Sequence, residues 1–365
     1  MASGLGIAAL AAWVAIWILA LRIPWRPGPP PAGVWRHGKV VAIVPARDEA
    51  LTIALAVRSL AAQRYRGDFH IVVVDDASSD GTAEKARAAA PATCLSVIHA
   101  GPLASGWAGK VWAMADGVHY AAQLAPDWFL FTDADIVHPP GALADLVARA
   151  ESGRFDLVSY MVTLSCKSFA ERALVPAFVF FFFLLYPQPW SAAAAGGCVL
   201  IRRGALAAIG GLGAIRSELI DDCALARAVR RSGGRTWLGV SSDTHSIRTY
   251  GSFRQIGRMI SRTAFTQLRQ STLLLLLTVA ALAFVFFTPP VLAVRGSWLG
   301  WAAWLLMCAA YFPALHFYRR SVIWAPLLPL VAGFYTLATI HSAVAHWRGK
   351  GGAWKGRVQT RSRGA

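Results

Sequence analysis

The chain has 365 residues, of which 56% are hydrophobic and only 15% are charged. That apolar content is higher than one soluble core requires, so part of the chain is expected to lie in lipid. The formal net charge of +17 suits anionic headgroups or a phosphorylated substrate, and the long apolar segments that accompany it argue against a nucleic-acid-binding protein. The five cysteines form no CxxC pair and their number is odd, which favours a reducing, cytosol-facing location over a zinc site or a disulfide framework.

The first segment is an uncharged apolar run, residues 3–21, about one bilayer long. The basic residues Arg22 and Arg26 follow the run instead of preceding it, so we predict an uncleaved transmembrane anchor over 1–22. The positive-inside rule then places the residues after 22 in the cytoplasm, at the inner (cytoplasmic) membrane of the cell. A Pro-rich connector, residues 23–38, is expected to act as a stiff spacer.

Residues 39–250 alternate short apolar runs with amphipathic segments, which predicts repeated strand–helix units, an α/β fold and a largely parallel sheet. The expected strands are 39–46, 70–76, 95–100 and 128–135, and the expected helices are 50–63 and 79–90. The second helix should have Ser79 or Asp80 as its N-cap and Glu84 in its first turn.

Three further apolar segments, about 272–294, 298–318 and 322–346, predict a transmembrane helical bundle within 271–347, with Pro289–Pro290 kinking or ending the first. A basic interface helix, 251–270, should precede the bundle, and a basic tail, 348–365, should follow it. The apolar run 173–186 is too short to span comfortably, so the segment 173–190 is expected to lie in the interface or to line an acceptor groove.

Counting the crossings exposes a conflict at the tail. An outside N-terminus followed by four spans would place residues 348–365 outside, against their six basic residues. Either one segment is re-entrant or the tail departs from the positive-inside rule.

Three acidic clusters stand where predicted strands give way to loops: Asp75–Asp76, Asp133 with Asp135, and Asp221–Asp222. At such positions a carboxylate can reach a phosphate-bound metal or an incoming hydroxyl. The D-x-D spacing of Asp133 and Asp135 lets both carboxylates approach one divalent ion, Mg²⁺ or Mn²⁺, that bridges the diphosphate of a nucleotide donor. A single D-x-D also occurs by chance in many loops, but the order of the three clusters between apolar ends predicts sugar transfer at a membrane.

Residues at the ends of the first two predicted strands are candidates for holding the nucleotide. Asp76 is the candidate for the base or ribose, and the alternative is that Asp75 and Asp76 only cap the helix that follows. The segment Pro45, Ala46, Arg47 to Glu49 could pack against the nucleotide, with Arg47 near a phosphate, or form a simple strand-to-helix turn. Lys110 could hold a phosphate as a mobile point charge or be a solvated surface lysine.

Asp221 and Asp222 open a predicted helix, where acids either cap the helix N-terminus or present a general base to the acceptor hydroxyl. Farther along, Arg254, Arg258 and Arg262 recur every four residues and form one cationic stripe on a helix. The stripe could neutralise a leaving diphosphate or lie against lipid headgroups.

Several long motifs of this chain resemble those of family-2 inverting glycosyltransferases with the GT-A fold, and the resemblance extends over nearly the whole chain. It is closest to the hopene-associated (hopanoid biosynthesis) branch, called HpnB, through PARDEA, GWAGKVWA, TDADI, LVSYMVTLSCKSFAERALVPAFVFFF, AAAAGGC and LIDDCALARAV. Membrane-bound relatives, including ceramide glucosyltransferases, have similar ends, and WKGR at 354–357 looks like theirs.

The resemblance implies a GT-A (Rossmann-like) catalytic domain and a role for each matched residue. Nucleotide-sugar contacts would come from residues near the strand ends and on the basic helix, with a catalytic group of Asp222, Asp221 and Arg258 and a metal pair of Asp133 and Asp135. The resemblance implies nucleotide contacts from Ala46, Glu49, Asp76 and Lys110. The full predicted set of nucleotide-contacting residues adds Pro45, Arg47, Asp75, Asp133, Gln255 and Arg262.

Three positions depart from the pattern of the relatives. Asp48 stands where relatives often have Asn, and Asp221 replaces the Glu of a Glu-Asp pair. Met259 replaces the Trp of a Gln-x-x-Arg-Trp motif that is otherwise matched by Gln255 and Arg258, which bears on how the acceptor or diphosphate is held.

We therefore expect a metal-dependent, membrane-embedded transferase that moves a sugar from a UDP-sugar to a lipid hydroxyl, with a hopanoid as the acceptor implied by the resemblance. Membrane lipids are expected partners, and nucleic acid is not. The alternatives are a ceramide-type glycolipid transferase, a processive polysaccharide synthase, and a non-catalytic lipid-binding scaffold that keeps a degenerate nucleotide domain.

Overall fold

The protein is described from a computed structural model, and the described residues are 2–26, 28–29, 33, 36–349, 351, 353–354 and 357–358. The chain divides into two compact units. The sheet unit comprises Arg26–Leu164, Ala192–Arg248 and Trp354–Ala365, and the helical unit comprises Met1–Trp25, Ser165–Ser191 and Thr249–Ala353. Parts of the predicted Pro-rich connector, most of the predicted tail, and Lys355 and Gly356 of the WKGR motif lie outside the described residues.

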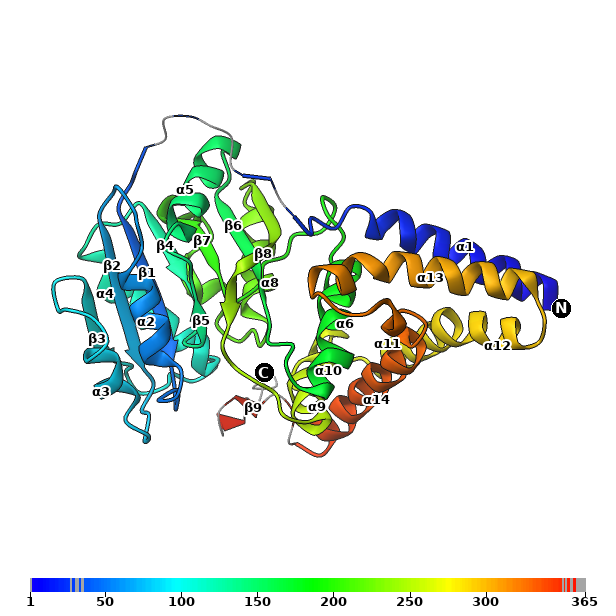
Figure 1. Cartoon of the computed structure of the whole chain (residues 1–365). Coiled ribbons are helices and arrows are strands. Elements are labelled where there is room, and N and C mark those ends of the chain that lie inside the picture. The colour runs from blue at the N-terminus through cyan, green and yellow to red at the C-terminus, as the bar shows by residue number, and fades with distance from the viewer. Residues whose placement is uncertain are drawn as a thin grey trace. The chain divides into compact units, whose positions relative to one another are not determined.

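The sheet unit is built on an eight-stranded sheet with the order β3-β2-β1-β4-β7-β6-β8-β5 (Figure 1). The strands are β1 Val40–Ala46, β2 Phe69–Asp75, β3 Leu95–His99, β4 Trp128–Phe131, β5 Ile136–Val137, β6 Leu157–Thr163, β7 Val199–Arg202 and β8 Thr236–Ser246. The first four, β1 to β4, confirm the four strands predicted from the apolar runs. A short pair, β9 Ala353–Trp354 and β10 Arg357–Val358, forms a separate two-stranded sheet.

The sheet is mixed, because four of its seven strand pairings are parallel and three are antiparallel, whereas the sequence predicted a largely parallel sheet. Strands β1, β2, β3 and β4 pair in parallel, and so do β6 and β8. Strand β7 is antiparallel to both β4 and β6, and β5 is antiparallel to β8. The reason is that the chain between β6 and β7 contributes a helix to the helical unit, so these strands are not joined by a crossover helix packed on the sheet.

Helices cover both faces of the sheet: α2 Ile53–Ala61, α3 Thr82–Arg87, α4 Gly109–Ala122, α5 Ala142–Gly153, α7 Arg203–Ala208 and α8 Asp221–Arg231, with a 3-10 turn η1 at Gly211–Ile215. Alternate residues of β1 enter two separate cores, Val44 with Ile53 of α2 and Ile43 with Val111 of α4. Burial on both faces explains why these strands are apolar throughout instead of alternating with polar residues.

The start of α3 differs from the prediction by one or two residues. Gly81, with a φ of 83°, occupies the N-cap position in place of Ser79 or Asp80. Asp80 instead accepts hydrogen bonds from the backbone N–H and hydroxyl of Thr82, the first residue of α3. The left-handed turn needed there is accessible to glycine, and Glu84 lies in the first turn as predicted.

Among the described residues, four helices are long and apolar enough to cross a membrane, at residues 3–20, 272–294, 298–317 and 328–347, and all four lie in the helical unit. The elements are α1 Ala2–Ala20, α6 Phe169–Leu185, α9 Phe253–Ser261, α10 Ala264–Gln267, α11 Thr272–Leu282, η2 Ala283–Phe287, α12 Thr288–Val294, α13 Trp298–Phe317, η3 Val322–Trp324 and α14 Leu328–Trp347. Their length and composition indicate that the protein associates with a membrane.

Two details of these helices bear on the predicted boundaries. The segment before Pro289–Pro290 is a π-helical turn, η2, which shifts the hydrogen-bond pattern where the prolines lack N–H donors, so the helical span continues to Val294 instead of ending at the prolines. The last helix begins at Leu328 instead of 322, because η3 and the sequence up to Pro326 form a separate turn.

Helix α6 packs with the helical unit, although its sequence lies inside the predicted catalytic domain 39–250. It begins with a capping box in which Ser168 and Glu171 exchange hydrogen bonds with each other's backbone N–H groups. The Glu171 carboxylate is fully buried and also accepts from Lys167 N and Tyr250 N. Glu171 therefore ties the start of α6 to the start of α9 within this unit.

Candidate active site

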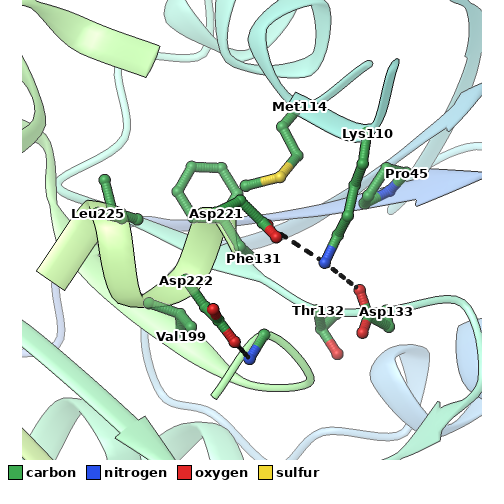
Figure 2. A pocket seen from close by; sticks show the side chains of 11 residues that line it. Pro45, Lys110, Met114, Phe131, Thr132, Asp133, Val199, Asp221, Asp222 and Leu225 are labelled. Carbon is green, nitrogen blue, oxygen red and sulfur yellow. Dashed lines mark hydrogen bonds and ion pairs between the residues drawn. The ribbon is translucent and has the colours of Figure 1, made fainter. Parts of the chain in front are cut away.

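A pocket at the carboxyl end of β4 brings two of the three acidic clusters together. Figure 2 shows Lys110, Asp133, Asp221 and Asp222 around it. Its wall is completed by Pro45, Met114, Phe131, Thr132, Gly196, Val199 and Leu225. These residues come from β1, α4, the β4 loop, the segment before β7 and α8, so the pocket exists only because the sheet aligns segments that are far apart in the sequence.

Lys110, in the first turn of α4, links two of the clusters. Its ammonium lies 2.8 Å from Oδ1 of Asp133 and 3.2 Å from Oδ2 of Asp221 (Figure 2). Burial alone would lower the pKa of Lys110, but the negative charges of Asp133, Asp221 and Asp222 raise it above its ordinary value. Lys110 is therefore a fixed cation at the pocket, and the alternative of a solvated surface lysine is wrong.

Asp222 is held by the backbone on both of its carboxylate oxygens. Gly196 N–H donates to Oδ2 and Cys223 N–H donates to Oδ1, each at 2.7 Å. Burial and the neighbouring charge of Asp221 raise the pKa of Asp222 to about 6, although Lys110 and the two hydrogen bonds oppose the shift. A carboxyl group with a pKa near the working pH is suited to accept a proton and to release it again.

The predicted helix that opens with Asp221 and Asp222 is confirmed as α8. Asp221 and Asp222 are its first two residues, where the N-terminal end of the helix favours negative charge. Capping does not account for both side chains, because Asp221 pairs with Lys110 and Asp222 turns to the Gly196 segment.

The two carboxylates of the D-x-D pair have different partners in the described residues. Asp133 lines the pocket and pairs with Lys110. Asp135 is buried, accepts from the Ser246 hydroxyl at 2.6 Å, and lies 3.3 Å from Nε of Arg248. Burial, followed by the charge of Asp133, raises the pKa of Asp135 above its ordinary value. The two side chains are thus electrostatic neighbours, each balanced by its own cation.

Two carboxylates suit a hard divalent cation such as Mg²⁺ or Mn²⁺, because such ions prefer oxygen ligands. Among the described residues, no group of three His, Cys, Asp or Glu side chains is placed to hold a metal ion. The donor set of Asp133 and Asp135 therefore fits an ion that takes its remaining ligands from a bound diphosphate and water, instead of a closed protein cage.

The candidate nucleotide residues lie along the carboxyl ends of β1 and β2. Ala46 pairs with Asp75 in the sheet register, and Arg47 donates to the Asp76 carbonyl at 2.6 Å and lies 3.4 Å from its carboxylate. Asp75 is buried, and its Oδ1 has no hydrogen-bond partner among the described residues. A buried acceptor without a donor points to a ligand that supplies one.

Glu49 joins this edge to the D-x-D loop. Arg248, just after β8, donates to Glu49 at 2.5 Å while it also pairs with Asp135. Glu49 and Arg248 are 199 residues apart in sequence. Arg248 and Ser246 are functional candidates that the sequence analysis missed, since β8 itself was not among the predicted strands; its Ser, Asp and His residues weaken the apolar signal.

Three predicted site residues lie in the helical unit. Gln255, Arg258 and Arg262 belong to α9 or its C-cap and are exposed, and Gln255 accepts a hydrogen bond from Gly251 N–H at 2.7 Å. Their joint action with the residues of the sheet unit remains a prediction of the sequence resemblance.

Gly196 is a third residue that the sequence analysis did not single out. A Cβ at this position would lie 3.2 Å from Nζ of Lys110 and 3.3 Å from Oδ2 of Asp222. The signal was present in the AAAAGGC motif, but nothing in the motif itself reveals that its backbone approaches α8.

Comparisons with known proteins agree with the fold of the sheet unit. Residues 41–210 match the family described as Glycosyl transferase family 2. The fold is similar to that of the mannosyltransferase PcManGT from Pyrobaculum calidifontis, solved in complex with GDP-Man and Mn²⁺, with 20% identity, a TM-score of 0.57 and coverage of 94% of this chain and 99% of that chain.

A more distant likeness is to glucosyl-3-phosphoglycerate synthase from Mycobacterium tuberculosis in complex with phosphoglyceric acid. The two are 18% identical, with a TM-score of 0.44 and coverage of 64% of this chain and 79% of that chain. The search of the curated proteins found no match. Residues 41–210 thus match a family of glycosyltransferases, and the chain has a GT-A α/β fold with apolar helices at both ends.

Proposed function

We propose that the protein transfers a single sugar from a UDP-sugar to the hydroxyl of a membrane lipid, with inversion at the sugar, and that the lipid is a hopanoid. The observation that carries the proposal is the Asp222 carboxylate, fixed by two backbone N–H groups in a pocket beside Lys110 and Asp133. In the part of the chain that the structure describes, four helices are apolar enough to lie in a bilayer, so an acceptor that also resides in the membrane suits this protein.

The proton transfer is assigned to Asp222. In a single displacement, the acceptor hydroxyl attacks the anomeric carbon, the bond from that carbon to the diphosphate breaks, and the hydroxyl proton passes to the base. A carboxylate whose pKa is raised to about 6 holds that proton better than an ordinary aspartate, and the bonds from Gly196 and Cys223 keep it oriented. Asp221 supports the raised pKa and positions Lys110.

The donor diphosphate is assigned to the side of the pocket that holds Lys110 and Asp133. The ammonium of Lys110 is a fixed positive charge there and can neutralise phosphate oxygens. A divalent cation held by Asp133 and Asp135 would stabilise the charge of the departing diphosphate. The similar mannosyltransferase PcManGT, solved with GDP-Man and Mn²⁺, supports a nucleotide sugar and a metal of this kind.

The nucleotide is assigned to the edge formed by β1 and β2. Asp75, with its buried acceptor, and Asp76 would face the base or ribose, and Pro45, Ala46 and Arg47 would border it. Glu49 contributes through Arg248, which keeps it beside Asp135. The uridine base is the choice implied by the sequence resemblance.

The acceptor assignment is drawn from composition and resemblance. The apolar helices and the exposed arginines of α9 suit a substrate that stays in the membrane, and the long shared motifs favour the hopanoid branch. Basic residues after α1 favour a cytoplasmic location for the sheet unit at the inner membrane. Arg258 and Arg262 would offset charge on the diphosphate, and Gln255 would contact the nucleotide.

The deciding experiment compares lipid extracts of cells with and without the protein by mass spectrometry, followed by assay of the purified enzyme with labelled UDP-sugars. The expected result is a lipid carrying one additional hexose, formed only when both the protein and Asp222 are present. Formation of a polymer would replace the lipid acceptor with a growing saccharide. A glycosylated lipid that is not a hopanoid would retain the reaction and discard this acceptor.

A further inference from the structure

The fourth apolar helix, α14, begins beside the points where the chain enters the helical unit. The ring of Trp324, in the turn before α14, lies 5.6 Å from that of Phe169, and Phe334 lies 5.9 Å from Phe253. Phe169 and Phe253 each lie four residues past an entry point, Ser165 and Thr249 respectively. We name this side of the helical unit its entry face.

The other end of α14 returns to the same region. Phe265 of α10 contacts the rings of His346 and Trp347, at 5.4 and 5.8 Å between centroids. Ala343 shares a buried cluster with Phe265 and with Leu275, which lies in the first turn of α11. The C-terminal end of α14 therefore lies beside the N-terminal end of α11, the first part of the membrane-crossing segment 272–294.

Helices α9 and α10 run alongside α14 in the same direction. The paired residues are Phe253 with Phe334, Ser261 with Ser342, whose hydroxyl donates to the Ser261 carbonyl, and Phe265 with His346. In each pair the two residues are 81 positions apart, as the hydrogen bond records. A constant offset means that residues 334–346 of α14 run parallel to residues 253–265 of α9 and α10.

Helix α9 has the character of a helix in the membrane interface. Ile256 and Ile260 are buried, whereas Arg254, Arg258 and Arg262 are exposed at four-residue spacing. Three guanidinium groups in the hydrocarbon core would be costly, and a basic amphipathic helix instead lies in the plane of the headgroups. Because residues 334–346 of α14 run alongside α9 and α10, this part of α14 lies near the same plane.

The first and third apolar helices, α1 and α13, run in a different direction from α14 (Figure 1). Figure 1 shows α1 and α13 side by side along their length. At one end, a Cβ on Gly6 would meet Leu299 at 2.9 Å, and at the other end Trp25 and Phe317 lie 5.7 Å apart. These two helices are antiparallel and run from the entry face to the opposite face. Gly300 packs against Leu292 and Ala293, so α12 ends at that opposite face too.

The charges of the helical unit fit this arrangement. Glu171 is its one acidic residue, against twelve Lys and Arg. If α14 does not cross, Arg295 is the lone basic residue in the turn at the opposite face, and the six basic residues of 348–365 share the entry face with Arg22, Arg319 and Arg320. A crossing by α14 would move all six to the opposite face, against the positive-inside rule.

We infer that α14 is a re-entrant interfacial helix, so that the chain crosses the membrane three times and its C-terminus lies on the same side as the sheet unit. This inference selects one of the two explanations that the sequence left open for the tail. It depends on contacts within the helical unit alone and is independent of the sugar, the acceptor and the reaction.

The test brackets α14 with introduced cysteines in the full-length protein. Ser321→Cys lies in the exposed turn before α14, and Ala365→Cys is the last residue of the chain. Gly204→Cys, exposed and without neighbours within 4 Å of its Cβ, reports the side of the sheet unit, and Gly4→Cys reports the N-terminus. Each variant is labelled with a membrane-impermeant maleimide in sealed right-side-out and inside-out vesicles, with the unsubstituted chain giving the background from its five cysteines.

The expected result is that Ser321→Cys, Ala365→Cys and Gly204→Cys are labelled from one side and Gly4→Cys from the other. Labelling of Ser321→Cys and Ala365→Cys from opposite sides would show that α14 crosses and would overturn the inference. Labelling of all four positions from one side would overturn the count of three crossings. Neither result depends on activity, so failure here is distinct from failure of the proposed function.

Discussion

The backbone N–H of Gly196 donates to Oδ2 of Asp222 at 2.7 Å, and this bond joins the segment before β7 to the first turn of α8. The bond holds the carboxylate of Asp222 against the backbone of Gly196, which has no side chain to push the carboxylate away. The same glycine lies next to Nζ of Lys110, so one small residue sets the separation between the base and the fixed cation.

Replacement of the candidate base should abolish transfer and leave donor binding nearly intact. Asp222→Asn keeps the shape and an acceptor for Gly196 N–H but cannot take a proton, so we expect kcat to fall by about 10²–10⁴-fold. Titration calorimetry with UDP measures binding, and the exposed Asp243→Asn serves as the control. Substantial residual turnover by Asp222→Asn would remove Asp222 from this role.

A methyl group at position 196 should disturb the site without unfolding the protein. In Gly196→Ala the new Cβ would approach Lys110 Nζ and Asp222 Oδ2 at 3.2 and 3.3 Å, so both side chains must move. We expect kcat/KM to fall by at least about tenfold, equivalent to about 1.4 kcal/mol, with little change in Tm. Gly204→Ala, where the new Cβ meets no atom within 4 Å, is the matched control. Equal activity in the two variants would contradict the importance of this close approach.

Activity should depend on a carboxyl group that titrates near pH 6. The pKa of Asp222 is raised to about 6, first by burial and then by Asp221, so below that pH the base is protonated and kcat/KM should fall tenfold per pH unit. Asp221→Asn removes a charge that raises this pKa, so the acidic limb of the profile should move to lower pH. If the acidic limb of the kcat/KM profile of Asp221→Asn does not shift, the titrating group is not Asp222.

The D-x-D pair should govern metal-dependent donor binding. Asp135→Ala removes one of the two proposed oxygen ligands and leaves Arg248 without one of its partners, so nucleotide affinity in Mn²⁺ should fall by at least about tenfold. Calorimetry with UDP is performed in Mn²⁺ and in EDTA, with the exposed Asp145→Ala as the control. The same affinity for Asp135→Ala and the unsubstituted protein in both conditions would exclude the assignment.

Glu171 should be a main determinant of the stability of the helical unit. Glu171→Ala removes the acceptor of three backbone N–H groups, those of Lys167, Ser168 and Tyr250, and should destabilise the unit by about 2–5 kcal/mol. Thermal unfolding in detergent measures the effect, and the exposed Glu84→Ala is the control. A Tm equal to that of the control would show that water replaces these bonds.

The same carboxylate gives a pH dependence of stability with a defined sign. Burial would raise the pKa of Glu171, but the hydrogen bonds from Tyr250, Ser168 and Lys167 lower it below its ordinary value of 4.5. Its contribution is therefore present above that value and is lost as the pH falls below it. Glu171→Ala should accordingly flatten the acid side of a Tm profile.

The sequence by itself determined the local elements and the types of chemical group. The apolar runs predicted β1, β2, β3 and β4, because strands buried on both faces leave a continuous apolar signal. The length of the apolar segments predicted the four long helices, and Asp221–Asp222 correctly marked the start of α8. The order of the acidic clusters and the resemblance of the long motifs predicted the glycosyltransferase family, which the family match supports.

Only the tertiary structure decided which distant residues meet. The pairing of Arg248 with Glu49 and Asp135 spans up to 199 residues, and no local pattern encodes such a contact. The antiparallel insertion of β7, the assignment of α6 to the helical unit and the approach of Gly196 to Asp222 depend on strand order and chain path. Secondary structure follows from neighbours in sequence, whereas the electrostatic balance of this site follows from neighbours in space, which the fold alone brings together.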